Sequence, residues 1–581
     1  MSKNKEVAEI FERIADILEI LEDNRFKVRA YRNAARNLTE LGDDIEAIAE
    51  RNELEKIPAI GKDLAAKIRE YIEQGKISYY EGLIERVPEG LVALLGIQGL
   101  GPKTLARLFK DLGVKSLEDL QRTIEGEEIL KLEGMGEKKV QDIRRGIQVF
   151  QEGAQRAPLG ILLPVAETLI GEISKIPGTE GTIAAGSLRR MKETIGDIDI
   201  LTMADDGQRV IEAFTKLPFA REVLASGDTK GSIIIRNGIQ VDLRVIGPES
   251  YGAALQYFTG SKAHNVKLRT IALKKGLKIN EYGIFRGDEK LAGETEKEIY
   301  GIIGLEWIPP EIREDKGEIE SALEGRLPEL VELSDIKGDL HTHSKWSDGK
   351  SSIEEMALKA KELGYEYIAI ADHSPSSRIA GGLSVERLYE KKKEIEAVRK
   401  KLTGIKVLMG SEVDIRSDGS LDYPDEVLKD LDVVVASVHS GFKMDRETMT
   451  MRITRALQNP FVHILGHPTG RLIGERDPYQ VDIDRVIRTA KEFGKAVEVN
   501  SFYSRLDLND IHVRKAMDMG VRIVISTDSH HTDHLSMMRL GVATARRGWA
   551  EKKDVLNTLG YDELSDWLSY GKGGHISPSE G

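Results

Sequence analysis

Hydrophobic residues recur at helical spacing through the first part of the chain. In VAEIFERIADILEIL, residues 7–21, apolar side chains return every three or four positions, which predicts a helix with one buried face. Residues 1–85 keep this pattern, and residues 86–155 continue it in segments that glycine-rich turns divide. We therefore predict two helical domains, one over each range.

The pattern changes near Ile183. Short apolar runs such as TIAAGSL, IDILTM and GSIIIRNGIQVDLRVI predict strands joined by turns. Asn237 and Gly238 stand between two β-branched runs and predict the turn of a hairpin. We expect a sheet-containing domain over residues 156–248, and a smaller mixed domain over residues 249–315.

Apolar runs alternate with amphipathic segments from Asp335 onward. The runs include YIAIADHS, VLMGSEVDI, DVVVASVHS, HILGHP, AVEVNS and RIVISTDSHH. This alternation predicts a parallel, barrel-like α/β domain over residues 335–570. The acidic residues 316–334 before it predict a linker, and residues 571–581 after it predict a disordered tail.

Composition narrows the classes of function. Among 581 residues there is no cysteine, which excludes disulfides and a thiolate zinc site, so a metal must be held by His, Asp or Glu. We find no signal pattern and no apolar run of membrane-spanning length, and we expect a cytoplasmic protein without a membrane partner. The net charge of −13 alone argues against nucleic-acid binding. Residues 251–300, however, carry nine Lys/Arg against six Asp/Glu, and phosphates are met by local patches.

A glycine turn recurs three times before a helical run, as IPAIG, IQGLG and LEGMG. Such a turn points backbone N–H groups outward and can hold a phosphate without reading bases. An ordinary turn between helices is the alternative interpretation of any single copy. Three copies, each with a following lysine, favour helix-hairpin-helix contacts to the DNA backbone. The turn glycines are Gly61, Gly99, Gly101, Gly134 and Gly136, and the lysines are Lys62, Lys103 and Lys138.

Three aspartates indicate a first chemical site. Asp197 and Asp199 alternate on a predicted strand and so share a face, and Asp242 lies on the run VDLRV. Converging carboxylates repel one another, and two Mg²⁺ ions would both neutralise them and serve phosphoryl transfer. Two surface aspartates near a turn are the alternative. The polar and basic neighbours Gly186, Ser187, Arg189 and Arg190 favour the site, because they could bind phosphate oxygens.

These motifs resemble the nucleotidyltransferase palm of the family X DNA polymerases, the group that contains DNA polymerase beta. YFTGSKAHN, residues 257–265, is similar to the family's nucleotide-binding segment, and INEYGIF, residues 279–285, to its thumb. The resemblance implies that Tyr257 and Phe258 pack against the incoming sugar and disfavour a ribose 2′-hydroxyl. It further implies roles in nucleotide or template binding for Gly186, Ser187, Arg189, Arg190, Gly196, Gly260, Asn265 and Arg269.

The N-terminal region resembles the family's lyase domain, which removes a 5′-deoxyribose phosphate through a lysine Schiff base. The resemblance places Lys67 at the position of the nucleophile, and Lys27 and Tyr31 at the phosphate-binding and supporting positions. Asp63 stands where the family often has a basic residue. A solvated helix lysine is the alternative interpretation of Lys67, and we expect this domain to grip a 5′-phosphate at a gap in either case.

Histidines and acids at strand ends indicate a second site. His341 and His343 alternate on one strand, so both imidazoles point the same way. The carboxyl ends of strands in a β/α barrel converge on one face. A lone histidine there would be structural, whereas nine residues with N or O donors suit Zn²⁺, Mn²⁺ or Fe²⁺. The nine are His341, His343, Asp348, His373, Glu412, His439, His467, Asp528 and His530.

This second half resembles the PHP (polymerase and histidinol phosphatase) domain, which has a trinuclear metal site in a distorted seven-stranded β/α barrel. Aspartate at Asp348 stands where many relatives have histidine. Such a cluster activates water and clamps a phosphate, and Arg378, Lys443 and Arg505 could bind the DNA backbone nearby. The resemblance implies one ion on His341, His343, Glu412 and Asp528, a second on Glu412, His439 and His467, and a third on Asp348, His373 and His530.

The resemblance implies a multidomain DNA repair polymerase that fills short gaps, with Asp242 assisting deprotonation. Its substrates would be gapped or primer–template DNA and a dNTP, with Mg²⁺ or Mn²⁺ in the polymerase site. The PHP domain would hold up to three Zn²⁺, Mn²⁺ or Fe²⁺ ions and act as a 3′–5′ exonuclease, with AP endonuclease and 3′-phosphatase activity. We expect a monomer with these domains: lyase-like 1–85, helix-hairpin-helix fingers-type 86–155, α+β palm 156–248, thumb-type 249–315, linker 316–334, (β/α)₇ PHP barrel 335–570 and tail 571–581.

Two other functions remain open on the sequence alone. One is a small-molecule phosphatase of the histidinol-phosphatase type fused to a DNA-binding module. The other is a DNA-end-binding scaffold in which both sites are inert. The complete sets of acidic and histidine ligands disfavour both.

Overall fold

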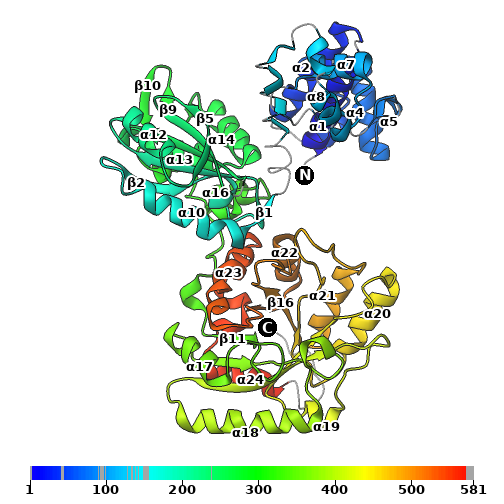
Figure 1. Cartoon of the computed structure of the whole chain (residues 1–581), viewed down its shortest axis with the longest axis vertical. Helices are drawn as coiled ribbons and strands as arrows, with labels where there is room; N and C mark the ends of the chain where they lie inside the picture. Colours follow the sequence, from blue (N-terminus) through cyan, green and yellow to red (C-terminus); the bar gives the residue numbers. More distant parts are fainter. Residues whose placement is uncertain are drawn as a thin grey trace. The chain divides into compact units, whose positions relative to one another are not determined.

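The chain forms two compact units (Figure 1). The computed structural model describes residues 3–570, apart from 22, 41–44, 85, 89–90, 92–93, 95–96, 98–99, 127, 133–134, 138, 142, 145, 148–155 and 237. The first unit comprises residues 1–155, 234–240 and 266–274, and the second comprises the rest. The predicted tail, residues 571–581, and Asn237 of the predicted hairpin lie outside the described residues.

The first 155 residues are helical where they are described, as the apolar spacing predicts. One cluster of buried side chains, including Phe11, Leu38, Leu54, Leu105 and Leu120, runs through both predicted helical domains. The helices are α1 (Lys3–Ile20), α2 (Arg25–Glu40), α3 (Ile45–Glu50), α4 (Lys62–Gln74), α5 (Ser78–Ile84), α7 (Pro102–Leu112) and α8 (Leu117–Glu125).

A five-stranded sheet in the order β2-β4-β7-β6-β5 carries the first set of acids. Its edge strand β2 (Glu180–Ala184) pairs antiparallel with β4. The other strands are β4 (Asp197–Met203), β5 (Ala220–Ser226), β6 (Lys230–Ile235) and β7 (Gln240–Ile246). The helices around it are α10 (Leu159–Ile173), α11 (Gly186–Arg189) and α12 (Gly207–Thr215), and β1 (Ala157–Pro158) pairs with β3 (Thr194–Ile195).

The segment that follows contains the helices α13 (Tyr251–Thr259), α14 (Lys262–Lys274) and α15 (Glu296–Ile302). It holds the three-stranded sheet β8 (Lys278–Asn280), β9 (Gly283–Arg286) and β10 (Glu289–Ala292). Helix α13 packs against α15 and against strands β8 and β9. Part of the expected linker is not free. Glu318, the first residue of α16 (Glu318–Leu323), is fully buried, and its Oε1 lies 2.7 Å from His264 Nδ1. This buried pair fixes the start of the linker segment, a contact that the acidic composition does not reveal.

Seven parallel strands form a nearly closed barrel, as the alternating pattern predicts. Asp528 N–H donates to His341 O and His343 N–H to Ser529 O, which joins the last strand region to the first. The strands are β11 (Gly338–Thr342), β12 (Tyr367–Ile370), β13 (Lys406–Asp414), β14 (Val433–Ser437), β15 (Ile464–Leu465), β16 (Ala496–Asn500) and β17 (Ile523–Ser526). The helices are α17 (Ile353–Glu362), α18 (Val385–Lys401), α19 (Asp425–Leu428), α20 (Arg446–Leu457), α21 (Ile483–Glu492), α22 (Asp510–Met519), α23 (Met538–Arg547) and α24 (Tyr561–Tyr570).

Apolar side chains form two buried clusters in the barrel domain. One of them includes Leu340, Ala369, Val435, Ile464 and Val524 of the barrel strands. Because the interior is packed, polar side chains gather at the strand ends instead. Within the described part of the chain, no helix is both long and apolar enough to cross a membrane.

Candidate metal centres

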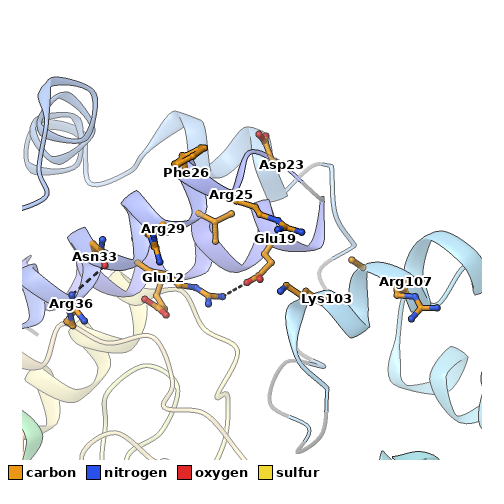
Figure 2. Close-up of a pocket in the computed structure, with 13 residues that line it drawn as sticks. Glu12, Glu19, Asp23, Arg25, Phe26, Arg29, Asn33, Arg36, Lys103 and Arg107 are labelled. Atoms are coloured by element: carbon orange, nitrogen blue, oxygen red, sulfur yellow. Dashed lines mark hydrogen bonds and ion pairs between the residues drawn. The ribbon is translucent and has the colours of Figure 1, made fainter. Parts of the chain in front are cut away.

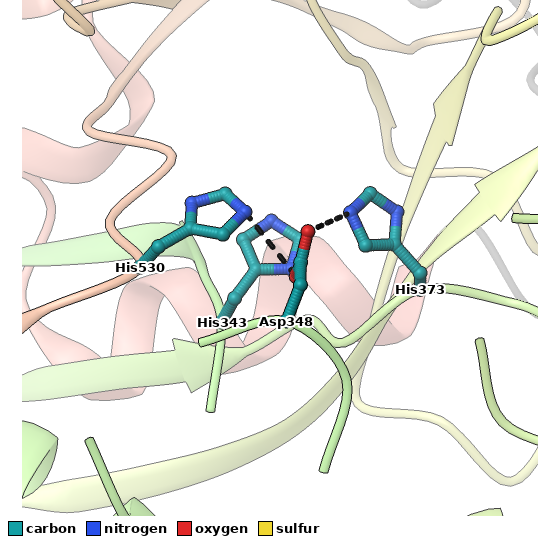
Figure 3. Close-up of side chains that lie close together, drawn as sticks. All are labelled: His343, Asp348, His373 and His530. Carbon is teal, nitrogen blue, oxygen red and sulfur yellow. Dashed lines mark ion pairs between the residues drawn. The ribbon is translucent and has the colours of Figure 1, made fainter. Parts of the chain in front are cut away.

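Imidazoles and carboxylates converge at the carboxyl ends of the barrel strands. Figure 3 shows Asp348 between His373 and His530, with His343 beside it. Asp348 Oδ1 lies 3.3 Å from His530 Nε2, and Asp348 Oδ2 lies 3.5 Å from His373 Nε2. The ligand atoms of these four side chains lie within 4.8 Å of one another. Two further groups meet the same spacing, namely His341 with His343 and Asp528, and His373 with Glu412 and His439.

Glu412 joins these groups. Its Oε1 lies 2.8 Å from His467 Nε2 and 3.1 Å from His439 Nε2. Its Oε2 lies 3.0 Å from His373 Nδ1 and 3.4 Å from His341 Nε2. The side chain is 1% exposed. His343 Nε2 lies 3.7 Å from the same Oε2, so one buried carboxylate reaches five imidazoles. The structure brings all nine sequence-predicted ligands into one cluster.

Several ring nitrogens in the cluster are buried and have no hydrogen-bond partner. They include Nε2 of His341 and both nitrogens of His343. Leaving a buried nitrogen unpaired is costly, and a divalent cation at this point would satisfy it. The donors are nitrogen and oxygen only, a set that suits Zn²⁺, Mn²⁺ or Fe²⁺. The residues present therefore fit the metal cluster that the sequence implies.

The charges within the cluster favour ionised carboxylates. Burial alone would raise the pKa of Glu412, but the surrounding histidines hold it well below its usual range. Burial alone would lower the pKa of His373, yet Glu412 and Asp348 outweigh it and raise this pKa to about 10. His343 differs, because burial together with His530 and His373 lowers its pKa to about 4. Its imidazole is therefore neutral at pH 7, the form that binds a metal.

Two acids outside the predicted set orient the ligands. Glu498 on β16 is fully buried, and its Oε1 lies 2.7 Å from His341 Nδ1 while its Oε2 accepts the His467 N–H at 2.6 Å. Asp414 Oδ1 lies 2.9 Å from His439 Nδ1. Such partners fix the ring so that the other nitrogen faces the metal. Sequence reasoning missed both, although an acid inside the apolar run AVEVN, and a second acid two positions after Glu412, were available signals.

A cavity of about 800 Å³ opens onto the cluster. Arg378, Arg416 and Arg505 line it together with the ligands. Arg505 Nε lies 3.4 Å from Asp528 Oδ2. Lys443 is exposed and is not among the lining residues. The cavity thus combines cation ligands with basic side chains, which suits a phosphate ester.

The three acids of the five-stranded sheet lie near enough to repel one another. Burial, with the charges of Asp197 and Asp242 added, raises the pKa of Asp199 to about 7. Burial and Asp242 also raise the pKa of Asp197. An all-carboxylate donor set fits Mg²⁺ or Mn²⁺. Among the described residues the groups within 4.8 Å all lie in the barrel, so these three acids are less tightly gathered.

Neighbouring residues shape this acidic site. Lys230 Nζ lies 3.0 Å from Asp242 Oδ2, and Ser232 Oγ donates to Asp242 Oδ1 at 2.6 Å. Sequence reasoning missed both, although they alternate on the run TKGSI as the acids do on theirs. Gly186 has a φ of 57°, and a Cβ there would lie 2.1 Å from Asp199 Oδ2. The first turn of α11 therefore closes against Asp199 and requires glycine.

Comparison with known proteins assigns these parts. A DNA polymerase beta thumb model matches residues 254–314, and a PHP domain model matches residues 339–502. A helix-hairpin-helix domain model matches residues 2–77, and a SAM-like helix-hairpin-helix tandem model matches residues 91–148. The DNA polymerase/3′-5′ exonuclease PolX of Bacillus subtilis (strain 168) is 41% identical over 568 residues, which are 97% of this chain and 99% of that protein. This chain belongs to the family X DNA polymerases.

Two other relatives match parts of this family X chain. DNA polymerase lambda of Arabidopsis thaliana is 26% identical over 350 residues, or 53% of this chain and 62% of that protein. A probable phosphatase of Thermoanaerobacter sp. (strain X514) is 32% identical over 231 residues, or 38% of this chain and 89% of that protein. The phosphatase likeness is thus partial, whereas the PolX likeness runs through both units.

The two arginines predicted for the nucleotide site are paired with carboxylates. Arg189 makes two 2.8 Å contacts, from NH1 to Glu296 Oε1 and from NH2 to Glu296 Oε2. Arg190 Nε donates to Glu314 Oε1 at 3.0 Å. Ser187 is half-buried in the same short helix, α11. The structure thus places both guanidinium groups on carboxylates of the thumb segment, a pairing that sequence reasoning did not foresee.

The other predicted nucleotide-site residues lie on α13, α14 and beside the acids. The Tyr257 and Phe258 rings meet edge to face at 5.1 Å. Asn265 Nδ2 donates to Tyr257 O at 2.7 Å, which ties the two helices together. Gly260 follows α13 with a φ of 71°, Gly196 directly precedes Asp197, and Arg269 is half-buried on α14.

The lyase candidates lie on two helices of the first unit. Lys67 Nζ lies 2.6 Å from Asp63 Oδ1, one turn earlier on α4, and 5.0 Å from the centre of the Tyr79 ring. Tyr31 is buried and stacks on Tyr79 at 6.2 Å. Lys27 is exposed. The predicted nucleophile is therefore an ion-paired lysine.

The helix-hairpin-helix turns present open backbone. Gly61 and Gly101 stand at the N-termini of α4 and α7, and a Cβ on either would meet nothing within 4 Å. Gly136 is equally open, whereas Gly99 and Gly134 lie outside the described residues. A cavity of about 1000 Å³ lies at α1, α2 and α7 (Figure 2). Six basic side chains line it together with three acids: Arg25, Arg29, Arg32, Arg36, Lys103 and Arg107 with Glu12, Glu19 and Asp23. The excess of basic side chains in this lining, beside open helix turns, suits a DNA backbone.

Proposed function

We propose that this chain extends the primer strand in short DNA gaps and degrades DNA from its 3′ end in the PHP barrel. Primer extension is supported by the position of Asp197, Asp199 and Asp242, which lie near one another beside Gly186 in a family X chain. Degradation from the 3′ end is supported by the nine-residue cluster around Glu412. Gapped or primer–template DNA and a dNTP are the substrates, and a single chain carries both sites.

In the palm, Asp197, Asp199 and Asp242 would hold Mg²⁺ or Mn²⁺. When bound, these ions supply the positive charge that phosphoryl transfer needs at the attacking and leaving oxygens. Asp242 is the group that assists removal of the primer hydroxyl proton, and Ser232 fixes its carboxylate through the 2.6 Å hydrogen bond. Tyr257 and Phe258 pack against the incoming sugar, and Asn265 holds Tyr257 in place.

In the barrel, the nine ligands would hold up to three Zn²⁺, Mn²⁺ or Fe²⁺ ions. When bound, these ions activate water and neutralise the phosphate under attack. Arg378 and Arg505 would bind the strand backbone where they line the cavity. Glu498 and Asp414 keep His341 and His439 turned toward the cluster. The same arrangement suits cleavage at abasic sites and removal of 3′-phosphates, because each is a phosphate ester at or near a 3′ end.

The polymerase assignment is tested by gap filling. Wild-type protein and Asp199→Asn are compared on a one-nucleotide gap with Mg²⁺ and dNTPs, and Asp205→Asn, an exposed acid of the next turn, serves as the control. We expect extension by the wild type and by Asp205→Asn, and a loss of about a thousandfold or more in Asp199→Asn. Equal extension by Asp199→Asn would overturn the palm assignment.

A small-molecule phosphatase is the second candidate for the barrel, since a probable phosphatase is similar to 38% of this chain. The barrel assignment is tested by offering the same protein a DNA 3′ end, a 3′-phosphate, an abasic site and histidinol phosphate. We expect turnover of the DNA substrates that His341→Ala abolishes. Turnover of histidinol phosphate without any degradation of DNA would favour the phosphatase instead.

A further inference from the structure

A buried arginine of the barrel reaches the nucleotide segment of the palm within the second compact unit. Arg547 is the last residue of α23, and its side chain is 4% exposed. Its NH1 donates to the backbone oxygen of Arg190 at 2.8 Å and to Glu314 Oε1 at 3.2 Å. Its NH2 donates to Asp510 Oδ2 at 2.7 Å on the barrel side. One guanidinium thus joins α22, α23 and the end of α11.

Arg190 is held twice through this arrangement. Its backbone oxygen accepts from Arg547, and its side-chain Nε donates to Glu314 Oε1, the oxygen that Arg547 also contacts. Glu314 therefore lies between the two arginines. If Arg547 were lost, Arg190 would lose a backbone contact, and its partner Glu314 would lose one of the cations that fix its carboxylate.

A second barrel arginine holds the chain three residues further along. Arg471 is 8% exposed and donates to Glu193 Oε2 at 2.7 Å. The same side chain donates from Nε to the backbone oxygen of Arg505 at 2.9 Å. The palm and barrel backbones also approach closely, because a Cβ on Gly160 would lie 2.4 Å from Cβ of Tyr503. Arg547 and Arg471, both in the barrel, therefore hydrogen-bond to the two ends of residues 190–193.

We infer that these arginine contacts between palm and barrel do not serve only to hold the two domains together. An apolar interface would do that at lower cost, because a buried guanidinium must keep its donors paired. The planar fork of arginine, however, fixes its acceptors in direction as well as distance. The residues fixed here follow directly after α11, whose first glycine closes against Asp199.

We propose that Arg547 is a positioning residue for the polymerase reaction, holding Arg190 and the end of α11 where the triphosphate of a dNTP binds. The barrel then has two roles: it carries its own phosphoesterase cluster, and it completes the nucleotide site of the palm. This inference rests on the proposed polymerase function.

The test measures steady-state gap filling by the full chain in two single variants, Arg547→Lys and Glu193→Gln, and in the wild type. Both substitutions keep the side-chain volume similar, and lysine retains the charge but not the fork. We expect each to raise the KM for dNTP by about tenfold with kcat within about twofold. Degradation of a 3′ end without dNTP should stay at the wild-type rate for Arg547→Lys. Arg539→Ala, which removes an exposed palm–barrel pair with Glu167, is the matched control and should leave the KM unchanged.

The outcomes separate the two claims. A wild type that incorporates no dNTP refutes the polymerase function itself. A wild type that incorporates dNTP, with unchanged KM in both variants, refutes the positioning role alone. Equal losses in kcat, in 3′-end degradation and in the melting temperature would also overturn it, because they would show that Arg547 serves only the stability of the fold.

Discussion

A Cβ placed on Gly186 would lie 2.1 Å from Oδ2 of Asp199. The backbone of α11 thus forms one wall of the pocket around this carboxylate, and the positive φ of Gly186 brings the chain close enough to do so. No side chain fits between them. Gly186 and Asp199 are thirteen positions apart in the sequence, and the fold brings the glycine-serine turn into direct contact with the acid.

Gly186→Ala is therefore expected to displace Asp199 and to lower primer extension by at least about a hundredfold. Degradation of a DNA 3′ end should be unchanged, because the barrel lies on other strands. Gly171→Ala is the control, since a Cβ on this glycine of α10 meets nothing within 4 Å. Primer extension by Gly186→Ala at the wild-type rate would show that the close approach of Gly186 to Asp199 is not needed for the reaction.

Glu498→Gln is expected to weaken metal binding in the barrel by about ten- to a hundredfold, because the charge that orients His341 is removed. Metal content after dialysis and the rate of 3′-end degradation should fall together, and primer extension should stay constant. Glu492→Gln, an exposed acid at the end of α21, provides the control. Full metal content in Glu498→Gln would contradict the orienting role.

The palm should bind cations less well in acid. Burial and the neighbouring carboxylates raise the pKa of Asp199 to about 7, so a proton competes with the cation below that pH. The Mg²⁺ concentration for half-maximal extension should rise by about tenfold per pH unit below 7 and level off above it. A half-maximal concentration that is flat between pH 6 and pH 8 would contradict this coupling.

Without added metal, the raised pKa of Asp199 makes the stability of the folded state depend on pH. A carboxyl whose pKa is raised in the folded state costs stability as pH rises from the unfolded value of about 3.9 to about 7. Asp199→Asn should therefore raise the melting temperature, by an amount that grows between pH 4 and pH 7 and is constant above. If the difference in melting temperature between Asp199→Asn and the wild type shrank as pH rose, the pKa of Asp199 could not be raised in the folded state.

Lys67 should be a poor Schiff-base nucleophile in the wild type, because its ammonium is paired with Asp63 at 2.6 Å. Asp63→Ala removes this partner and should increase borohydride trapping on a 5′-deoxyribose phosphate end. Asp63→Ala with Lys67→Ala is the control for the identity of the lysine. Strong trapping by the wild type, unchanged in Asp63→Ala, would show that the ion pair has no influence.

Residues close in sequence were predictable, and residues joined only by the fold were not. The alternation of Asp197 with Asp199, and of His341 with His343, follows from strand geometry alone. The barrel ligands follow from the rule that strand ends converge. Glu498 is 157 residues from His341, and Arg547 is 357 from Arg190, so no local spacing signals either contact.

The central claim is that one chain carries two separate phosphate sites, and a four-way comparison tests it most directly. Wild type, Asp199→Asn, His341→Ala and the double variant act on one labelled primer in gapped DNA, with and without dNTPs. We predict that Asp199→Asn only shortens the primer, His341→Ala only lengthens it, and the double variant leaves it unchanged. If either single substitution abolished both reactions, or if the double variant still altered the primer, the assignment of two independent sites would be contradicted.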